Sequence, residues 1–177
     1  MVLYNMKPED ILRLFQFLTI TFYNPFANAI NVTEYRDLQP KIRYAVKTPA
    51  VFGIAWSVLY TLISVSVFLL YLERDNIETW IAYTNFSLYG VILLTTKIWT
   101  PLFFGFGPRS GGRTMWFRAL AFLDICVLLI AATTYTVLCF VADPTYVEPF
   151  WLPGALMIPL LVWLAYAGYL NYQSIEN

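Results

Sequence analysis

Lys97 and Asp124 place opposite charges deep inside two long apolar stretches of the 177-residue chain. Lys97 lies about eight residues before the loop of residues 105–114 and Asp124 about nine after it, so in antiparallel helices both would lie roughly 12–14 Å from the loop end. A lone charge is costly in such surroundings, and buried ions in membrane proteins usually pair or mark a function. We therefore predict a buried Lys97–Asp124 contact or a shared polar network. The alternative is that Lys97 extends towards the loop while Asp124 bonds to hydroxyl groups such as that of Thr96.

Aromatic side chains at helical spacing form the second candidate site. Phe52, Trp56 and Tyr60 follow one another at every fourth residue, so they share one helix face. Such a stripe can line a cavity for a flat apolar ligand, or it can pack between helices, and the spacing leaves both open. Small residues occupy the neighbouring face, where they would let another helix backbone approach closely. These small residues are Gly53, Ser57 and Thr61.

The last apolar stretch repeats the aromatic pattern on one of its sides. The residues on that side are Trp163, Tyr166, Ala167 and Leu170. If Trp56, Trp99 and Trp163 converge, they form an aromatic box suited to a flat apolar ligand. The other tryptophans stand at the ends of apolar stretches, where they would anchor the chain at the membrane–water interface. They are Trp80, Trp116 and Trp151.

Histidine, a residue type on which many catalytic and metal sites depend, is missing. The chain has no histidine, which excludes His-based general-base catalysis, proximal-histidine haem ligation and the usual His-containing metal sites. Cys126 and Cys139 would lie roughly 20 Å apart along one helix, too far for a disulfide. No catalytic triad or phosphate loop can be assembled, and the net charge is zero without a basic block. We therefore expect no enzyme activity, no metal, no required cofactor and no nucleic-acid partner.

Composition places these residues in a membrane protein. Hydrophobic residues make up 59% of the chain and charged residues only 12%, against about 25% charged in a typical soluble domain. Five apolar stretches follow, of which four exceed the roughly 20 residues needed to cross a bilayer and the first is just long enough. They cover about Ile11–Ile30, Val51–Leu72, Trp80–Phe104, Phe117–Val141 and Phe150–Asn171. The expected fold is all-α, a single five-transmembrane-helix bundle over residues 1–177.

The first apolar stretch is the least regular, because Gln16, Asn24, Pro25 and Asn28 interrupt it. It lacks the compact apolar core and the small-residue cleavage site of a secretory signal. We therefore expect a spanning helix that is kinked near Pro25. Pro159 should bend the last helix for the same reason, since its ring removes one backbone hydrogen bond.

Lysine and arginine residues sort to one side of the expected bundle. Seven lie in or beside the loops after the first and third helices, and three lie on the opposite side. These two loops and the C-terminus are therefore expected on the positive side, with the N-terminus across the membrane. The first of these loops, Asn31–Ala50, has about twenty residues and contains Pro40 and Pro49, and a connection of that length is usually functional.

Five segments follow patterns that occur together in a known family. TPAVFGIAWSVLY (Thr48–Tyr60) is similar to PP-x-W-V-F-G-P-V-W-x-x-LY, and EYRDLQPK (Glu34–Lys41) is similar to WYxxLxKP. WTPLFFG (Trp99–Gly105) is similar to W-x-P-x-FFG, and IPLLVWLAYAGYLN (Ile158–Asn171) to PYxxWxxFAxxLN. ALAFLDICVLLIAATT (Ala119–Thr134) has an acidic residue and an Ala-Thr run at the matching places. In this order the segments resemble the TspO/MBR (translocator protein, tryptophan-rich sensory protein) family.

The resemblance implies a bundle with a ligand pocket near the positive side, closed by the first loop. Such a pocket would bind a porphyrin, a haem precursor or a sterol-like lipid, for transport or for sensing. The partners it implies are membrane lipids and a hydrophobic small molecule, so any bound porphyrin or lipid would be a ligand. Carried onto this sequence, the ligand-binding residues are Pro49, Phe52, Trp56, Tyr60, Trp99, Asp124, Trp163, Tyr166 and Asn171.

Several positions depart from the family pattern. Ile92 and Thr96 replace the usual Gln and Asn of the third helix, Lys97 replaces one of two paired tryptophans, and Leu160 replaces a tyrosine. No lysine or arginine follows Tyr172, so the weak sterol-type pattern is absent.

These departures leave a second function open, that of a structural accessory subunit in a larger mitochondrial membrane complex. The two functions predict different bundle cores. A ligand-binding core is open between Trp56, Trp99 and Trp163, the three tryptophans that match the family pattern. A structural core is filled by Ile92, Lys97 and Leu160. In both cases we expect a multi-pass protein of a mitochondrial membrane, which can also form a homodimer.

Overall fold

A computed structural model describes residues 6–27, 39–43, 45–46, 48, 50–104, 115–142 and 151–176. Within these ranges the chain forms helices and no strands, which confirms the all-α class. Five are α-helices and one is a short 3₁₀ helix. Their bounds are α1 (Pro8–Phe22), η3 (Gln39–Lys41), α3 (Ala50–Glu73), α4 (Thr79–Phe104), α5 (Met115–Val141) and α6 (Trp151–Glu176).

Four of these helices, α3 to α6, are long and apolar enough to cross a membrane. The shortest, α3, has 24 residues, which at about 1.5 Å per residue is roughly 36 Å and exceeds a hydrocarbon core of about 30 Å. The four predicted stretches match these helices to within a few residues at each end. Pro101 and Pro159 both lie inside continuous helices.

The first helix is shorter than predicted. It begins at Pro8, after the Lys7 N–H donates to the Asp10 carboxylate at 2.9 Å, and it ends at Phe22 after 15 residues, about 22 Å. Asn24 precedes Pro25, and a residue before proline avoids the helical conformation. The prediction of a spanning helix over Ile11–Ile30 with a kink near Pro25 is therefore wrong, because the helix stops before the proline.

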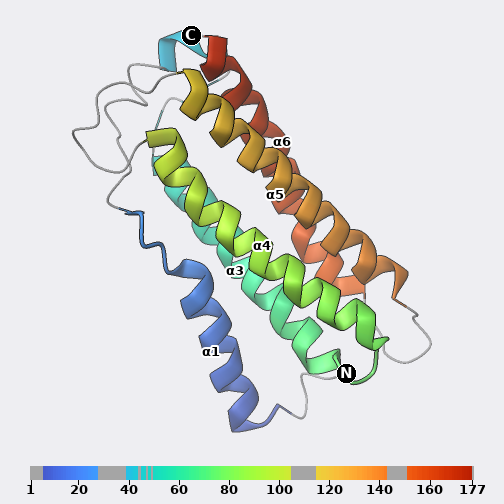
Figure 1. Ribbon diagram of the computed structural model, residues 1–177. Coiled ribbons are helices and arrows are strands. Elements are labelled where there is room, and N and C mark those ends of the chain that lie inside the picture. The colour runs from blue at the N-terminus through green and yellow to red at the C-terminus, as the bar shows by residue number, and fades with distance from the viewer. Residues whose placement is uncertain are drawn as a thin grey trace.

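The helices form a bundle in which neighbours in the sequence are not always neighbours in space (Figure 1). α5 packs along both α4 and α6, whereas α3 packs along α6 and α1. The backbones of α3 and α4 approach each other at few points, although only residues 74–78 join the two helices. α1 lies beside the half of α3 that leads into this connection, while η3 and the C-terminal end of α6 lie at the opposite end (Figure 1).

A polar contact joins α3 to α6 inside the core. The Ser66 hydroxyl donates to the Pro153 carbonyl at 2.7 Å and lies 3.1 Å from the Tyr135 hydroxyl. Ser66 and Tyr135 are almost completely buried, so these bonds satisfy groups that lipid and water cannot reach. Apolar side chains of all four long helices surround the contact, including Ile63, Leu128 and Met157.

Among the glycines that the structure describes, Gly154 lies in the tightest contact between α5 and α6. A Cβ at this position would lie 3.1 Å from the Cys139 Cβ and from Phe140, and 3.2 Å from the Thr136 carbonyl oxygen. We expect Gly154→Ala to lower the free energy of unfolding by about 1 kcal/mol, because the two backbones must move apart. Thermal unfolding followed by circular dichroism in detergent measures the effect.

Gly90→Ala is the matched control for this substitution, since nothing lies within 4 Å of a Cβ at Gly90. Alanine is a better helix former than glycine, so Gly90→Ala should keep or raise the melting temperature. If both variants melt at the same temperature, the close packing at Gly154 contributes nothing to stability.

Candidate functional site

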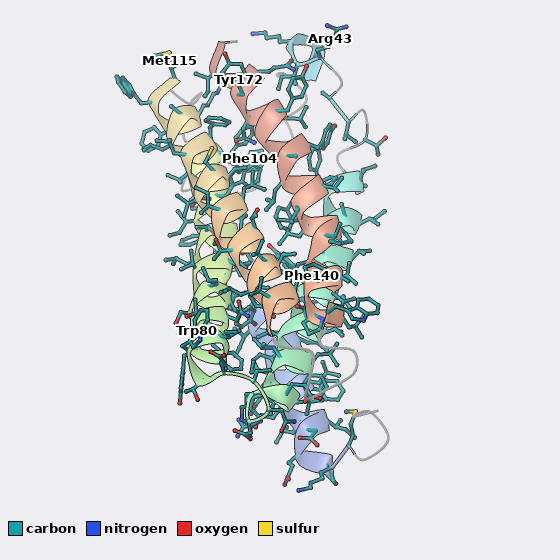
Figure 2. The ribbon with its side chains drawn as sticks, turned by 90° about the vertical axis from the view of Figure 1, so that its right-hand side faces the viewer. Arg43, Trp80, Phe104, Met115, Phe140 and Tyr172 are labelled. Atoms are coloured by element: carbon teal, nitrogen blue, oxygen red, sulfur yellow. The ribbon has the colours of Figure 1, made fainter. Side chains whose placement is uncertain are left out.

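A cavity of about 410 Å³ lies in the half of the bundle that contains the first turns of α3 and the last turns of α4 and α6. Phe104, one of its lining residues, lies in this half, at whose end Arg43 and Tyr172 are found (Figure 2). The described lining residues are Asn24, Ile42, Ala50, Phe52, Gly53, Trp56, Tyr60, Thr96, Trp99, Thr100, Phe103, Phe104, Ile125, Leu128, Trp163, Leu164, Ala167, Leu170 and Asn171.

Most of the predicted ligand-binding residues meet at this cavity. Six of them line it, namely Phe52, Trp56, Tyr60, Trp99, Trp163 and Asn171. Tyr166 does not line it but packs against Trp163, with ring centroids 5.7 Å apart. Asp124 is also absent from the described lining, and Pro49 lies outside the described residues.

The three matched tryptophans come from three helices and form much of the cavity wall. Trp163 of α6 meets Phe52 of α3 edge to face, with centroids 5.6 Å apart. The ring centroids of Trp56 and Tyr60, both on α3, are 5.3 Å apart. Trp99 of α4 stacks on Phe103, with centroids 5.0 Å apart and 17° between the ring planes. These contacts hold flat apolar surfaces in fixed orientations around the space.

Several lining residues were not predicted from the sequence. Thr96, Thr100, Phe103 and Phe104 continue the face of Trp99 at helical spacing, so the periodicity of α4 could have revealed them. Asn24 and Ile42 come from segments outside the long helices, and only the folded chain brings them to the cavity.

Few polar groups face the cavity. The Trp99 indole N–H donates to the Asn171 side-chain oxygen at 3.2 Å, and the Asn171 amide donates to the Ala167 carbonyl at 2.9 Å. The buried Trp163 indole nitrogen has no hydrogen-bond partner among the described residues. No charged side chain belongs to the described lining, so the cavity suits an apolar molecule.

Lys97 binds the end of α1. Its ammonium group donates to the Thr21 carbonyl and lies 4.4 Å from the centre of the Tyr60 ring. The Thr21 hydroxyl in turn lies 2.8 Å from the Tyr89 hydroxyl. The last carbonyls of a helix have no partner within the helix and carry partial negative charge, so a buried cation is stabilised there.

The predicted Lys97–Asp124 ion pair is therefore absent. Ion pairs in the described part of the chain join Lys7 to Glu9 and Arg74 to Asp75, and one buried oxygen of Asp124 has no hydrogen-bond partner there. Lys97 does not extend towards the loop either, since it is 9% exposed. The end of α1 binds the ammonium group in place of the carboxylate.

The stripe of small residues on α3 faces outward. Gly53, Ser57 and Thr61 are all exposed, and nothing in the described residues lies within 4 Å of a Cβ at Gly53. The two hydroxyl groups bond within the helix, Ser57 to the Gly53 carbonyl at 2.8 Å and Thr61 to the Ser57 carbonyl at 2.9 Å. The prediction that another helix of this chain packs on the stripe is wrong.

Comparison with known proteins agrees with this architecture. The family model of the TspO/MBR family matches residues 16–176, from the second half of α1 to the end of α6. Protein CrtK of Rhodobacter capsulatus is 28% identical over 122 residues. The matched part covers 69% of this chain and 65% of CrtK.

Proposed function

Because the chain belongs to the TspO/MBR family, we propose that this integral membrane protein binds a hydrophobic ligand inside its helix bundle, for transport or for sensing. The proposed ligand is a porphyrin-type tetrapyrrole or a sterol-like lipid, and binding involves no catalysis. The observation that carries the proposal is the cavity that Trp56, Trp99 and Trp163 share.

The size and chemistry of the cavity support such a ligand. Its volume of about 410 Å³ lies within the range of roughly 300–1,000 Å³ that is typical of small-molecule sites. Aromatic rings on α3, α4 and α6 offer flat faces to a ring system. Ile42 lines the cavity and stands in the sequence between two exposed basic residues, Lys41 and Arg43. The acidic groups of a porphyrin would lie towards this positive charge.

The open cavity favours ligand binding over the role of a structural accessory subunit. Ile92 and Leu160 are buried in the core, and Lys97 holds the end of α1. None of these three residues belongs to the described lining. The departures from the family pattern therefore leave the space between the tryptophans unfilled. A mitochondrial membrane is the proposed location.

Titration with protoporphyrin IX tests the proposal. With the protein in lipid nanodiscs, protoporphyrin IX should quench the tryptophan fluorescence saturably in the micromolar range. The Soret band of the porphyrin should shift in parallel. Trp163→Phe keeps an aromatic ring beside Phe52 but removes part of the indole surface that lines the cavity. We expect it to raise Kd about fivefold, which corresponds to about 1 kcal/mol of lost aromatic contact with the ligand. Competition by cholesterol would extend the ligand class to sterols.

Trp80→Phe serves as the control, because Trp80 is 56% exposed near the opposite end of the bundle. It should leave the Soret titration unchanged. A linear titration without saturation, or equal Kd values for Trp163→Phe and the parent protein, would count against binding in this cavity.

A further inference from the structure

One face of α3 is covered by α1 over part of its length. The Phe22 ring lies 5.6 Å from the Tyr60 ring, the Ser64 hydroxyl lies 3.5 Å from the Phe17 carbonyl, and the Phe17 ring lies 6.0 Å from the Tyr71 ring. Tyr60, Ser64 and Tyr71 are separated by four and seven residues, so at about 100° per residue they share one face of the helix.

Gly53 lies on this same face, seven residues before Tyr60. Because α1 ends at Phe22, beside Tyr60, no helix of the described residues covers the face at Gly53. Gly53 is exposed, a Cβ there would meet nothing within 4 Å, and yet its backbone lines the cavity. Among the residues that the structure describes, nothing closes the cavity beside Gly53, and it is open there to the outside of the bundle.

The other sides of this opening can also be identified. Asn24, two residues after the end of α1, lines the cavity. The Phe22 ring packs on the Tyr60 ring deeper in the bundle. The opening is thus bordered by Gly53 on α3 and by the first residues after α1.

The opening faces lipid. Gly53 lies one turn inside the start of α3, and Tyr60 lies about 10 Å deeper along the helix axis. A helix of roughly 36 Å extends only about 3 Å beyond each side of a 30 Å hydrocarbon core, so the opening begins where the acyl chains begin. The neighbouring exposed side chains on α3 include Ile54 and Val58, which are apolar.

We propose that the cavity has a lipid-facing entrance at Gly53, through which a ligand dissolved in the bilayer enters. This inference rests on the proposed function and narrows its ligand class to neutral, membrane-partitioned molecules, or to amphiphiles whose ring system enters first. The ligand then reaches the tryptophans without passing through the aqueous phase.

A photoreactive hydrocarbon tests the entrance independently of any natural ligand. A trifluoromethyl-phenyl-diazirine dissolved in the nanodisc bilayer is neutral and apolar, and its carbene inserts into the side chains it touches. Leu164 is the reporter, because it lines the cavity and is only 1% exposed, whereas Val162 on the same helix is 68% exposed and reports labelling from lipid. Mass spectrometry should find the label on both residues.

Gly53→Phe should close the entrance without disturbing the packing, since its Cβ meets open space. Labelling of Leu164 should fall at least fivefold while labelling of Val162 is unchanged. Gly90→Phe is the matched control, an exposed helical glycine with the same open surroundings that does not line the cavity. In Gly90→Phe, Leu164 and Val162 should be labelled as strongly as in the parent protein.

The outcomes separate this inference from the proposed function. If Leu164 is not labelled in the parent protein, or is labelled equally in Gly53→Phe, the entrance does not exist and ligands reach the cavity from the water side. If Leu164 labelling depends on Gly53 but protoporphyrin IX does not bind saturably, the entrance stands and the proposed ligand is wrong. If protoporphyrin IX binds, Gly53→Phe should slow its association and dissociation about tenfold.

Discussion

Ala167→Phe is expected to weaken ligand binding at least a hundredfold. Ala167 is 7% exposed and lines the cavity beside Trp163 and Leu164. A phenyl group built from this position would occupy the space that a ring-shaped ligand needs, and a ligand cannot enter a filled, closely packed interior without displacing side chains. A hundredfold change in Kd corresponds to about 2.7 kcal/mol of binding free energy. The measurement is the Soret titration with protoporphyrin IX.

Ala165→Phe is the control for this substitution, because Ala165 lies on the exposed face of the same helix. It adds the same side chain to α6 and should leave Kd unchanged. The melting temperature of Ala167→Phe should stay the same or rise, since the new ring fills existing space. Tight binding by a well-folded Ala167→Phe protein would mean that the ligand binds elsewhere.

Lys97→Met is expected to detach the end of α1 from the bundle. Methionine keeps most of the side-chain volume but cannot donate to the Thr21 carbonyl, and an unsatisfied buried carbonyl costs about 1–3 kcal/mol. The attraction between the ammonium group and the Tyr60 ring is lost as well. Removing a buried charge offsets part of this cost for the whole protein, so the effect should be largest in α1 itself.

Hydrogen–deuterium exchange measures the local effect. Peptides that cover Pro8–Phe22 should exchange about tenfold faster in Lys97→Met, which corresponds to about 1.4 kcal/mol of local stability. Peptides from α5 and α6 should keep their rates. Asp124→Asn is the control, because Asp124 makes no ion pair with Lys97. Faster exchange of α1 in Asp124→Asn, or unchanged exchange in Lys97→Met, would contradict the described role of Lys97.

The parts of the fold that depend on local composition could be predicted from the sequence. Long apolar stretches indicated α3 to α6, because lipid leaves a spanning segment few options besides a helix. Periodicity also placed Phe52, Trp56 and Tyr60 on one face, and the structure brings all three to one cavity. These predictions used only the chemistry of each segment and its own geometry.

The predictions that failed depend on which elements meet. Lys97 binds a backbone carbonyl, a group that every residue carries, so no side-chain pattern could identify Thr21 as its partner. The same limit applies to Gly53, Ser57 and Thr61. Their spacing shows that they share a face, but whether a helix covers that face depends on where α1 ends.

The arrangement of α3 among the long helices also bears on how the protein is made. Ribosomes deliver α3 and α4 to the membrane one after the other, yet the long helix along which α3 packs is α6, which is synthesised last of the helices. Until α6 arrives, Ser66 on α3 lacks the Pro153 carbonyl that it binds in the finished protein. Assembly must therefore join distant parts of the chain late in synthesis, a step that is slow for topologies rich in non-local contacts. During this interval the Ser66 hydroxyl can donate to a carbonyl of the preceding turn, as the Ser57 and Thr61 hydroxyls do in the finished protein.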